Sequence, residues 1–366
     1  MGPGAAIRRR GHDAPHHRMD VLVRCGPGEP DLRTMEYRTI GPSDLRLPVI
    51  TFGAWATGGW MWGGADRRAA VAAIRAAYDA GITAIDTAPI YGQGLSEEVV
   101  AEALEGIPRD RVQLLTKFGF RWDLKQGEFG MHTQDRYGRP LEVYKYAGRE
   151  SVIQECEQSM RRLRTDHIDL LQHHTPDGTT PISETMEAME RLVQQGKVRY
   201  IGVSNYTVEQ LNEARDHARV VSDQVPYSML KRAVEQELIP YTAQHGVGII
   251  AYSPLERGLL TGKYRPGHVF APGDHRTGHK HFRSQNIQRV NAMLNALRPI
   301  AADKGCTLGQ LVLRWTLDRP GITVLLVGAR DARQATENAN AVQVMLAPEE
   351  RRTIDAALEG LVLDLH

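Results

Sequence analysis

The sequence predicts a closed (β/α)8 TIM barrel, an α/β fold, with an N-terminal β-hairpin and extra C-terminal helices. From Val49 onward, short apolar segments with strand character alternate with segments of helical apolar spacing. Eight such pairs can be counted, and eight close a barrel more naturally than they form an open sheet. The length of 366 residues is one that α/β barrels reach as a single domain.

The expected elements follow one another as strand and then helix. The first four pairs are 49–54 with 67–80, 84–86 with 96–104, 112–117 with 150–164, and 168–173 with 182–195. The last four are 198–203 with 208–218, 221–224 with 235–245, 248–253 with 308–317, and 323–327 with 332–339. A further helix is expected at 348–358. Segments 37–40 and 45–48 suggest a hairpin that plugs one end of the barrel.

Three connections are long, at 119–149, 226–234 and 255–286. Long connections in a compact barrel are usually functional lids or disordered. The last one carries His268, His275, His279 and His281. Its histidine and glycine content favours mobility over metal binding.

Residues 1–34 combine an arginine run with scattered His, Gly and Pro and show no apolar periodicity. We expect this segment to be disordered or loosely attached. The arginines suit a solvated tail better than a basic arm for an anionic partner. One domain is therefore expected, over residues 35–366.

The composition is that of an ordinary soluble globule, with 42% apolar residues, 24% charged residues and a net charge of +1. This balance argues against nucleic acid or an anionic membrane as a partner. Cys25, Cys156 and Cys306 are too far apart in sequence to suggest a disulfide framework or a metal cluster. Without an apolar run of membrane-spanning length or a secretory signal, a cytoplasmic location is expected.

Three polar residues lie at or after the ends of two successive expected strands. Asp86 ends the strand 84–86, Tyr91 follows in a turn rich in Pro and Gly, and Lys117 ends the strand 112–117. A free phenol has a pKa of about 10, and a nearby ammonium lowers it by favouring the phenolate. We therefore expect Lys117 to lower the pKa of Tyr91 while Asp86 holds Lys117. The alternative is an ordinary Asp86–Lys117 ion pair at the barrel rim.

The expected strand 168–173 is followed directly by His174, so two histidines, His173 and His174, are adjacent. Catalytic groups in such barrels come from the carboxyl ends of the strands. Adjacent strand residues face opposite sides, so only one histidine points into the barrel mouth and the pair is a poor metal site. We predict that it is His174; the alternative is a core or rim histidine.

Six segments together resemble the aldo-keto reductases, in the order and spacing of that family. They are IDTAPIYGQGLSEE around Asp86 and Tyr91, LLTK ending at Lys117, HIDLLQHHTPD around His174, KVRYIGVSN ending at Asn205, YSPLERGLLTGKY from Tyr252, and VGAR ending at Arg330. The resemblance runs from about residue 36 to the C-terminus. It is most similar to bacterial members related to general stress proteins, to which WATGGWMWGG after the first strand contributes.

The resemblance implies an NADP-dependent oxidoreductase that reduces an aldehyde or ketone to an alcohol by reversible hydride transfer. Tyr91 would be the general acid in reduction. Lys117, held by Asp86, would lower the pKa of Tyr91, and neutral His174 would orient the carbonyl oxygen. These four residues form the expected catalytic tetrad.

The resemblance also implies how NADPH binds. The nicotinamide would contact Ser204, Asn205 and Gln224, with Tyr252 stacked on the ring. The pyrophosphate would lie under the loop 253–263, which contains Ser253, Leu255, Gly258 and Lys263. The 2′-phosphate would lie near Gly328, Arg330 and Gln334, with Glu337 and Asn338 near the adenine. This placement agrees with the rule that such barrels bind phosphate after strands seven and eight.

The sequence departs from the family at Thr175, where a large aromatic residue usually follows the catalytic histidine. One wall of the substrate pocket is therefore expected to be smaller or more polar. The remaining wall is expected to include Trp55, Trp60, Trp62, Trp122 and Tyr227, each of which suits core or loop packing equally well. The expected partner is a small carbonyl compound, and an oligomer is possible.

Two other classes of protein remain open. The first is a regulatory subunit that binds NADPH as a sensor, resembling the channel-associated β subunits of the same fold. The second is a metal-dependent barrel hydrolase or lyase that uses His173, His174 and Asp86. Because His173 and His174 are expected to face opposite sides and make a poor metal site, we predict no metal site.

Overall fold

Eight parallel strands close into a barrel in the computed structural model, which describes residue 1 and residues 35–365. The expectation for 1–34 thus falls almost entirely outside the described residues. In barrel order the strands are β10 (Val198–Ser204), β11 (Val220–Pro226), β12 (Gly248–Tyr252), β13 (Ile322–Val327), β3 (Ile50–Gly53), β4 (Ala84–Asp86), β5 (Gln113–Phe118) and β9 (Ile168–His173). The predicted fold class is confirmed.

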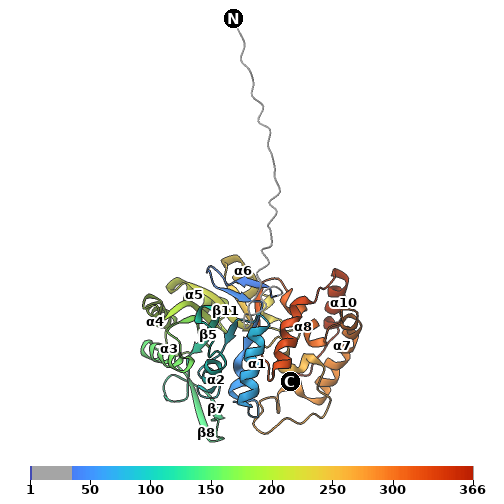
Figure 1. The fold of residues 1–366 in the computed structure, drawn as a ribbon, viewed down its shortest axis with the longest axis horizontal. Coiled ribbons are helices and arrows are strands. Elements are labelled where there is room, and N and C mark those ends of the chain that lie inside the picture. Colours follow the sequence, from blue (N-terminus) through green and yellow to red (C-terminus); the bar gives the residue numbers. More distant parts are fainter. Residues whose placement is uncertain (2–34, 366) are drawn as a thin grey trace.

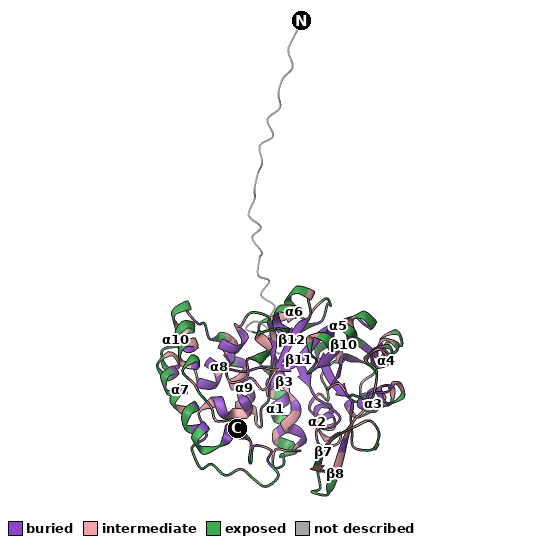
Figure 2. Cartoon of the chain, turned by 180° about the vertical axis from the view of Figure 1, so that it is seen from behind, coloured by how far each residue is buried: buried purple, intermediate pink, exposed green. Residues whose placement is uncertain are grey.

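Helices surround the barrel (Figure 1). They are α1 (Arg67–Asp79), α2 (Leu95–Ala103), α3 (Arg149–Leu163), α4 (Ile182–Gln194), α5 (Val208–His217), α6 (Leu238–His245), α8 (Leu308–Leu317) and α9 (Ala332–Ala339). Figure 2 shows the strands buried and the outer helix surfaces exposed. No helix in the described part of the chain has both the length and the apolar character needed to cross a membrane.

Local sequence signals explain where two of these helices begin. Thr207 and Thr307 are the N-cap residues of α5 and α8, and each threonine side chain accepts a hydrogen bond from the backbone N–H three residues later. In both cases the side-chain oxygen of the glutamine at that third position accepts a hydrogen bond from the threonine backbone N–H. These capping boxes satisfy two amide donors that a helix start otherwise leaves free.

The N-terminal hairpin closes one end of the barrel, as expected. It consists of β1 (Tyr37–Thr39) and β2 (Arg46–Pro48), which pair antiparallel. Leu45 and Leu47 pack among the inward-facing apolar side chains of the strands. A Cβ atom at Gly41 would lie 2.1 Å from a backbone oxygen of β11, so the hairpin approaches this closely only with glycine there.

The connection 119–149 contains three strands and is not a structureless loop, while a role as a functional lid stays a prediction. It forms an antiparallel sheet in the order β6 (Phe120–Arg121), β8 (Pro140–Lys145) and β7 (Glu128–Gln134). Lys145 pairs with Glu128 across two strands. The paired residues are separated in sequence, and the segment has the composition of a loop. The sequence alone therefore did not indicate these strands.

The connection 255–286 contacts the segment after β3, through His275 with Met61 and Asp274 with Trp62, and its expected mobility stays a prediction. It contains η4 (Glu256–Thr261) and η5 (Lys280–Phe282) and leads into α7 (Ser284–Asp303), a helix that the sequence reading left unassigned. Helices α7, α8 and α10 (Pro348–Glu359) share a second core with η4 beside the barrel (Figure 1). The helical spacing of Ile287, Val290, Leu294 and Leu297 was the available signal.

Further short 3-10 segments are η1 (Ala54–Gly58), η2 (Arg109–Arg111) and η6 (Asn340–Gln343). A fourth, η3 (Ala233–Glu235), precedes α6. The helix expected at 235–245 therefore begins at Leu238 instead. The element η1 matters most for the site, because it follows β3 at the carboxyl end of the barrel and leads to Trp60 and Trp62.

Candidate active site

Asp86, Tyr91, Lys117 and His174 come together at the carboxyl end of the barrel. Asp86 ends β4, Lys117 lies near the end of β5, and His174 follows β9. The Lys117 ammonium donates to the Asp86 carboxylate and, at 3.0 Å, to the carbonyl oxygen of Thr87. It lies 5.3 Å from the centre of the Tyr91 ring, whose centre is 5.8 Å from that of His174.

The electrostatic environment of Tyr91 differs from the expectation. Burial and the Asp86 carboxylate raise the pKa of Tyr91 well above its usual value. Lys117 is paired directly with Asp86, so its ammonium does not act on the phenol as an isolated charge. Burial also lowers the pKa of Lys117, against the opposing effect of Asp86. Tyr91 therefore holds its proton at neutral pH.

The two adjacent histidines occupy different environments. Burial, together with Lys117 and His173, lowers the pKa of His174 well below its usual value, so His174 is neutral. Its ring packs edge to face with Phe120 at 4.7 Å. His173 instead stacks on Phe118 and its Nδ1 lies 2.8 Å from the Tyr206 hydroxyl. Only His174 is therefore grouped with Tyr91.

Gln172 is a member of the site that the sequence reading did not include. Its Nε2 donates to Asp86 Oδ2 at 2.9 Å, and its Oε1 accepts from Gln224 Nε2 at 2.9 Å. Gln224 Nε2 also lies 2.9 Å from Asp86 Oδ2. Together with Lys117, the two amides hold the Asp86 carboxylate in place. Strand alternation was the available signal, because Gln172 and His174 are two residues apart and share a side.

The expected nicotinamide residues form one hydrogen-bonded group. Ser204 donates to the carbonyl oxygen of Gln224 at 2.7 Å. Asn205 Nδ2 donates to Ser204 Oγ and to the carbonyl oxygen of His174, both at 3.0 Å, and Asn205 Oδ1 accepts from the Tyr252 hydroxyl at 3.0 Å. Asn205 has a φ of 61°, a left-handed backbone that presents its side chain beside His174.

The loop after β12 brings cations together. Ser253 has a φ of 57° and starts a tight turn to Leu255 and Gly258. A Cβ atom at Gly258 would lie 3.2 Å from Lys263 Nζ, so the ammonium lies against the glycine backbone. Burial and the nearby Arg276 and Arg330 lower the pKa of Lys263. Mutually repelling cations of this kind fit the phosphates of a dinucleotide.

The residues around Arg330 hold one another in place. The Arg330 backbone N–H donates to Gln334 Oε1 at 3.2 Å, and its guanidinium donates to the Trp62 carbonyl oxygen at 2.9 Å. Asn338 donates to the carbonyl oxygen of Gly328 at 3.1 Å. The carbonyl oxygen of Glu337 accepts from Gln310. Asp331 is the N-cap residue of α9, and its side chain accepts a hydrogen bond from the backbone N–H of Gln334.

The predicted pocket residues separate into two groups. The Trp55 ring centre is 6.2 Å from that of Tyr91, and Trp62 packs edge to face on Trp55 at 5.2 Å. Trp60 and Trp122 belong to a satellite apolar cluster that also includes Tyr91 and Phe120. Thr175 follows His174 and is half-buried.

Tyr227 lies away from these residues. It is buried in the main core, and its hydroxyl donates to Glu235. This burial agrees with core packing, the alternative to a place in the pocket wall.

Glu256, His279 and His281 form a group with ligand-type atoms within 4.8 Å of one another. Arg257 takes part in this group: its Nη1 lies 3.0 Å from Glu256 Oε1 and 2.8 Å from His279 Nε2. His281 Nδ1 lies 3.0 Å from the same carboxylate oxygen. A guanidinium held between the candidate ligands makes this an ion-pair network that anchors the loop.

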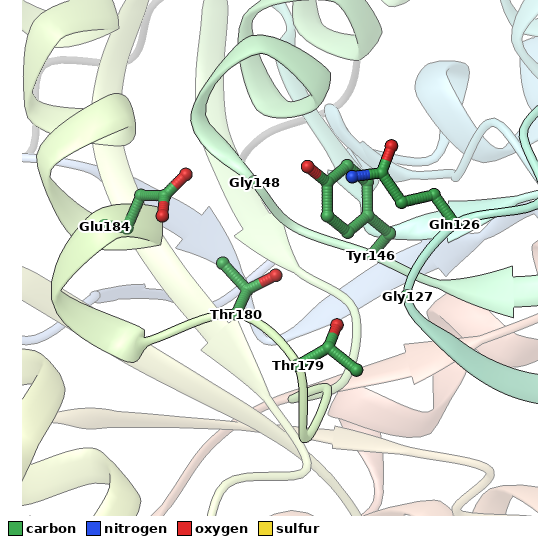
Figure 3. A pocket seen from close by; sticks show the side chains of 7 residues that line it. All are labelled: Gln126, Gly127, Tyr146, Gly148, Thr179, Thr180 and Glu184. Atoms are coloured by element: carbon green, nitrogen blue, oxygen red, sulfur yellow. The ribbon is translucent and has the colours of Figure 1, made fainter.

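A polar cavity lies outside the barrel mouth (Figure 3). It is lined by Gln126, Gly127, Tyr146, Gly148, Thr179, Thr180 and Glu184, from the segments that precede β7, α3 and α4 and from the first turn of α4. None of these residues belongs to the predicted site.

Fold and site together define an oxidoreductase that acts on carbonyl compounds with a nicotinamide cofactor. Residues 49–359 match the model of the aldo/keto reductase family, and the chain belongs to that family. It is 36% identical to the aldo-keto reductase YhdN of Bacillus subtilis, over 90% of this chain and 96% of that protein. It is 35% identical to the NADH-specific methylglyoxal reductase of Escherichia coli, over 88% and 98%.

A solved structure shows the same fold. The glycerol dehydrogenase AKR11B4 from Gluconobacter oxydans superposes with a TM-score of 0.79 at 33% identity, over 92% of this chain and 97% of that one.

Proposed function

We propose that this protein is an NADPH-dependent reductase that converts an aldehyde or ketone to an alcohol, with Tyr91 as the proton donor. The observation that carries the proposal is the cluster of Asp86, Tyr91, Lys117 and His174 at the carboxyl end of the barrel. When bound, the nicotinamide supplies the hydride. The protein supplies the proton, the orientation of the carbonyl and the binding of the phosphates.

Tyr91 is suited to be an acid because it is protonated at neutral pH. It transfers its hydroxyl proton to the carbonyl oxygen as negative charge develops there. The Lys117 ammonium lies near the phenol ring and is held by Asp86, whose carboxylate also accepts hydrogen bonds from Gln172 and Gln224. Such preorganised charge stabilises a phenolate without reorganisation.

Neutral His174 has a complementary role. A neutral imidazole donates one hydrogen bond to a carbonyl oxygen without competing with Tyr91 as an acid. Burial and Lys117 keep it neutral, and Asn205 bonds to its backbone carbonyl. Tyr91 and His174 therefore provide two donors for one carbonyl oxygen.

The preference for NADPH is supported by the three cations Lys263, Arg276 and Arg330. Arg276 is paired with Asp274, whereas Arg330 is exposed and uses a guanidinium nitrogen on a backbone carbonyl, leaving further N–H donors. The Escherichia coli relative is described as NADH-specific, so the family supports either cofactor. Arg330 distinguishes between them because NADH lacks the 2′-phosphate.

Tyr91→Phe tests the proposal. This change should lower kcat for carbonyl reduction by about 10² or more while NADPH binding stays nearly unchanged. Turnover is followed by NADPH absorbance, with a panel of aldehydes and ketones, and binding by fluorescence titration. Near-normal turnover in the variant would remove Tyr91 from the mechanism. NADPH binding without turnover of any carbonyl in the wild type would favour the sensor subunit instead.

A further inference from the structure

Three buried nitrogen atoms beside Tyr91 have no hydrogen-bond partner in the described structure. They are Nε1 of Trp55, Nε1 of Trp62 and Nε2 of His275. The His275 ring lies 4.7 Å from Trp55 and 4.8 Å from Trp62, so the three rings form one cluster. Unpaired polar atoms are rare in protein interiors and call for an explanation where they occur together.

Two segments far apart in sequence build this cluster. His275 belongs to the loop after β12, and its backbone N–H donates to the carbonyl oxygen of Met61 at 2.9 Å. Asp274 forms an isolated antiparallel bridge with Trp62. Arg330, which follows β13, also donates a hydrogen bond to the carbonyl oxygen of Trp62. The loop that carries His275 is therefore docked on the loop that carries the two tryptophans.

The hydrogen-bonding character of each nitrogen can be assigned. The two indole N–H groups are donors only. His275 Nδ1 contacts the Met61 carbonyl oxygen, which can only accept, so Nδ1 carries the proton and Nε2 has a lone pair. Burial lowers the pKa of His275, and the side chain is 7% exposed, which agrees with a neutral ring. The cluster thus offers two donors and one acceptor.

The geometry points to a subsite for a hydroxyl group of the substrate, formed by Trp55, Trp62 and His275. A hydroxyl both donates and accepts, so it pairs with His275 Nε2 and an indole N–H at once. A carboxylate or phosphate only accepts and would meet the lone pair of His275. The inferred substrate class is a neutral hydroxylated aldehyde or ketone, an inference that rests on the proposed function.

Access to these atoms requires a ring to turn, because all three are covered by neighbouring side chains. Turning either indole breaks no side-chain hydrogen bond, since neither N–H has one. Trp60 differs: its Nε1 donates to the carbonyl oxygen of Gln134 at 3.0 Å. Trp55 and Trp62 therefore each have an indole N–H without a hydrogen-bond partner. Trp60 has the same side chain, but its N–H is already hydrogen-bonded.

The test compares isosteric substrates that differ by a hydroxyl in place of a methyl group. Hydroxyacetone is paired with butanone and glycolaldehyde with propanal, and kcat/KM is measured for each. His275→Phe and Trp55→Phe keep an aromatic ring and remove one nitrogen. A hydroxyl also activates a carbonyl chemically, so the informative quantity is the ratio within a pair, compared between wild type and variant. Each variant should reduce this ratio about 10-fold.

Trp60→Phe is the control and should leave the ratio unchanged. An unchanged ratio in both His275→Phe and Trp55→Phe would overturn the subsite, as would a wild-type preference for pyruvate over hydroxyacetone. Binding is measured separately by saturation-transfer NMR on the full chain, with and without NADP+. If wild type prefers hydroxyacetone to butanone in binding and the two variants do not, the subsite stands even when no carbonyl is reduced. If wild type shows no such preference in binding or turnover, the subsite is wrong.

Discussion

Removing the charge of Lys117 should destabilise the protein as well as inactivate it, because Asp86 and Lys117 are buried together. Lys117 is fully buried and Asp86 nearly so. Breaking a buried ion pair by removing one partner costs about 3–5 kcal/mol. In Lys117→Met, Asp86 keeps Gln172 and Gln224 as donors at 2.9 Å. We therefore expect the low end, about 3 kcal/mol, or a Tm lower by about 4 °C for a chain of this length.

A double-mutant cycle isolates the pair. Asp86→Asn alone leaves the Lys117 ammonium buried with the Thr87 carbonyl, whereas Asp86→Asn with Lys117→Met leaves neither charge. The double variant should therefore be more stable than the sum of the single losses predicts, by about 2 kcal/mol. Unfolding is followed by circular dichroism, and reversibility is checked by rescanning.

Lys197→Met provides a control for this cycle. Its ammonium pairs with Glu157 at 2.7 Å, but both side chains are partly exposed. We expect a change of no more than about 0.5 kcal/mol. Additive losses in the Asp86–Lys117 cycle, or a Lys117→Met variant as stable as the control, would refute the coupling inferred from the structure.

Two further predictions concern cofactor choice and pH. Arg330→Ala should weaken NADPH binding by roughly 10- to 150-fold, from the loss of a charged hydrogen bond. The dissociation constant of NADH, measured in parallel, should change much less. Any change in it measures the effect of losing the Arg330 contact with the Trp62 carbonyl oxygen. Equal weakening of both nucleotides, or a wild-type preference for NADH, would contradict this role. Burial raises the pKa of Glu155 to about 8. The protonated side chain therefore contributes fully to the free energy of unfolding below its unfolded pKa of about 4, and this contribution is lost as pH rises through about 8. The loss is up to about 1.4 kcal/mol per pH unit. The Tm of Glu155→Gln should therefore fall less than that of wild type between pH 6 and pH 8, and parallel Tm curves would show that Glu155 is ionised in the folded state.

The pattern of the sequence was enough to predict the barrel. Alternating strands and helices specify parallel units through local apolar periodicity, and eight of them close into the observed barrel. The same periodicity predicted that adjacent histidines would separate, as His173 and His174 do. Strand alternation puts Gln172 on the side of His174, but we did not predict Gln172 as a site residue, and its contact with Asp86 is seen only in the structure.

Other features depended on contacts between distant segments. The sheet of β6, β7 and β8 forms by pairing across a segment with a loop-like composition, and the loop after β12 is held by Met61 and Trp62, more than 200 positions away in sequence. The pKa of Tyr91 also depends on surroundings that only the tertiary structure shows. Sequence suggested that Lys117 would lower it, whereas burial and the Asp86 carboxylate raise it in the structure.

Periodicity is a local property, so the chain encodes directly which residues face the barrel interior and in what order the strands occur. Hydrogen-bond pairing, burial and the cancellation of charges depend on which distant atoms finally meet. The sequence by itself therefore determined the fold and the identity of Asp86, Tyr91, Lys117 and His174 as candidates. The tertiary structure alone decided the direction in which the pKa values of Tyr91 and His174 shift, the contacts of Asp86 with Gln172 and Gln224, and the meeting of His275 with Trp55 and Trp62.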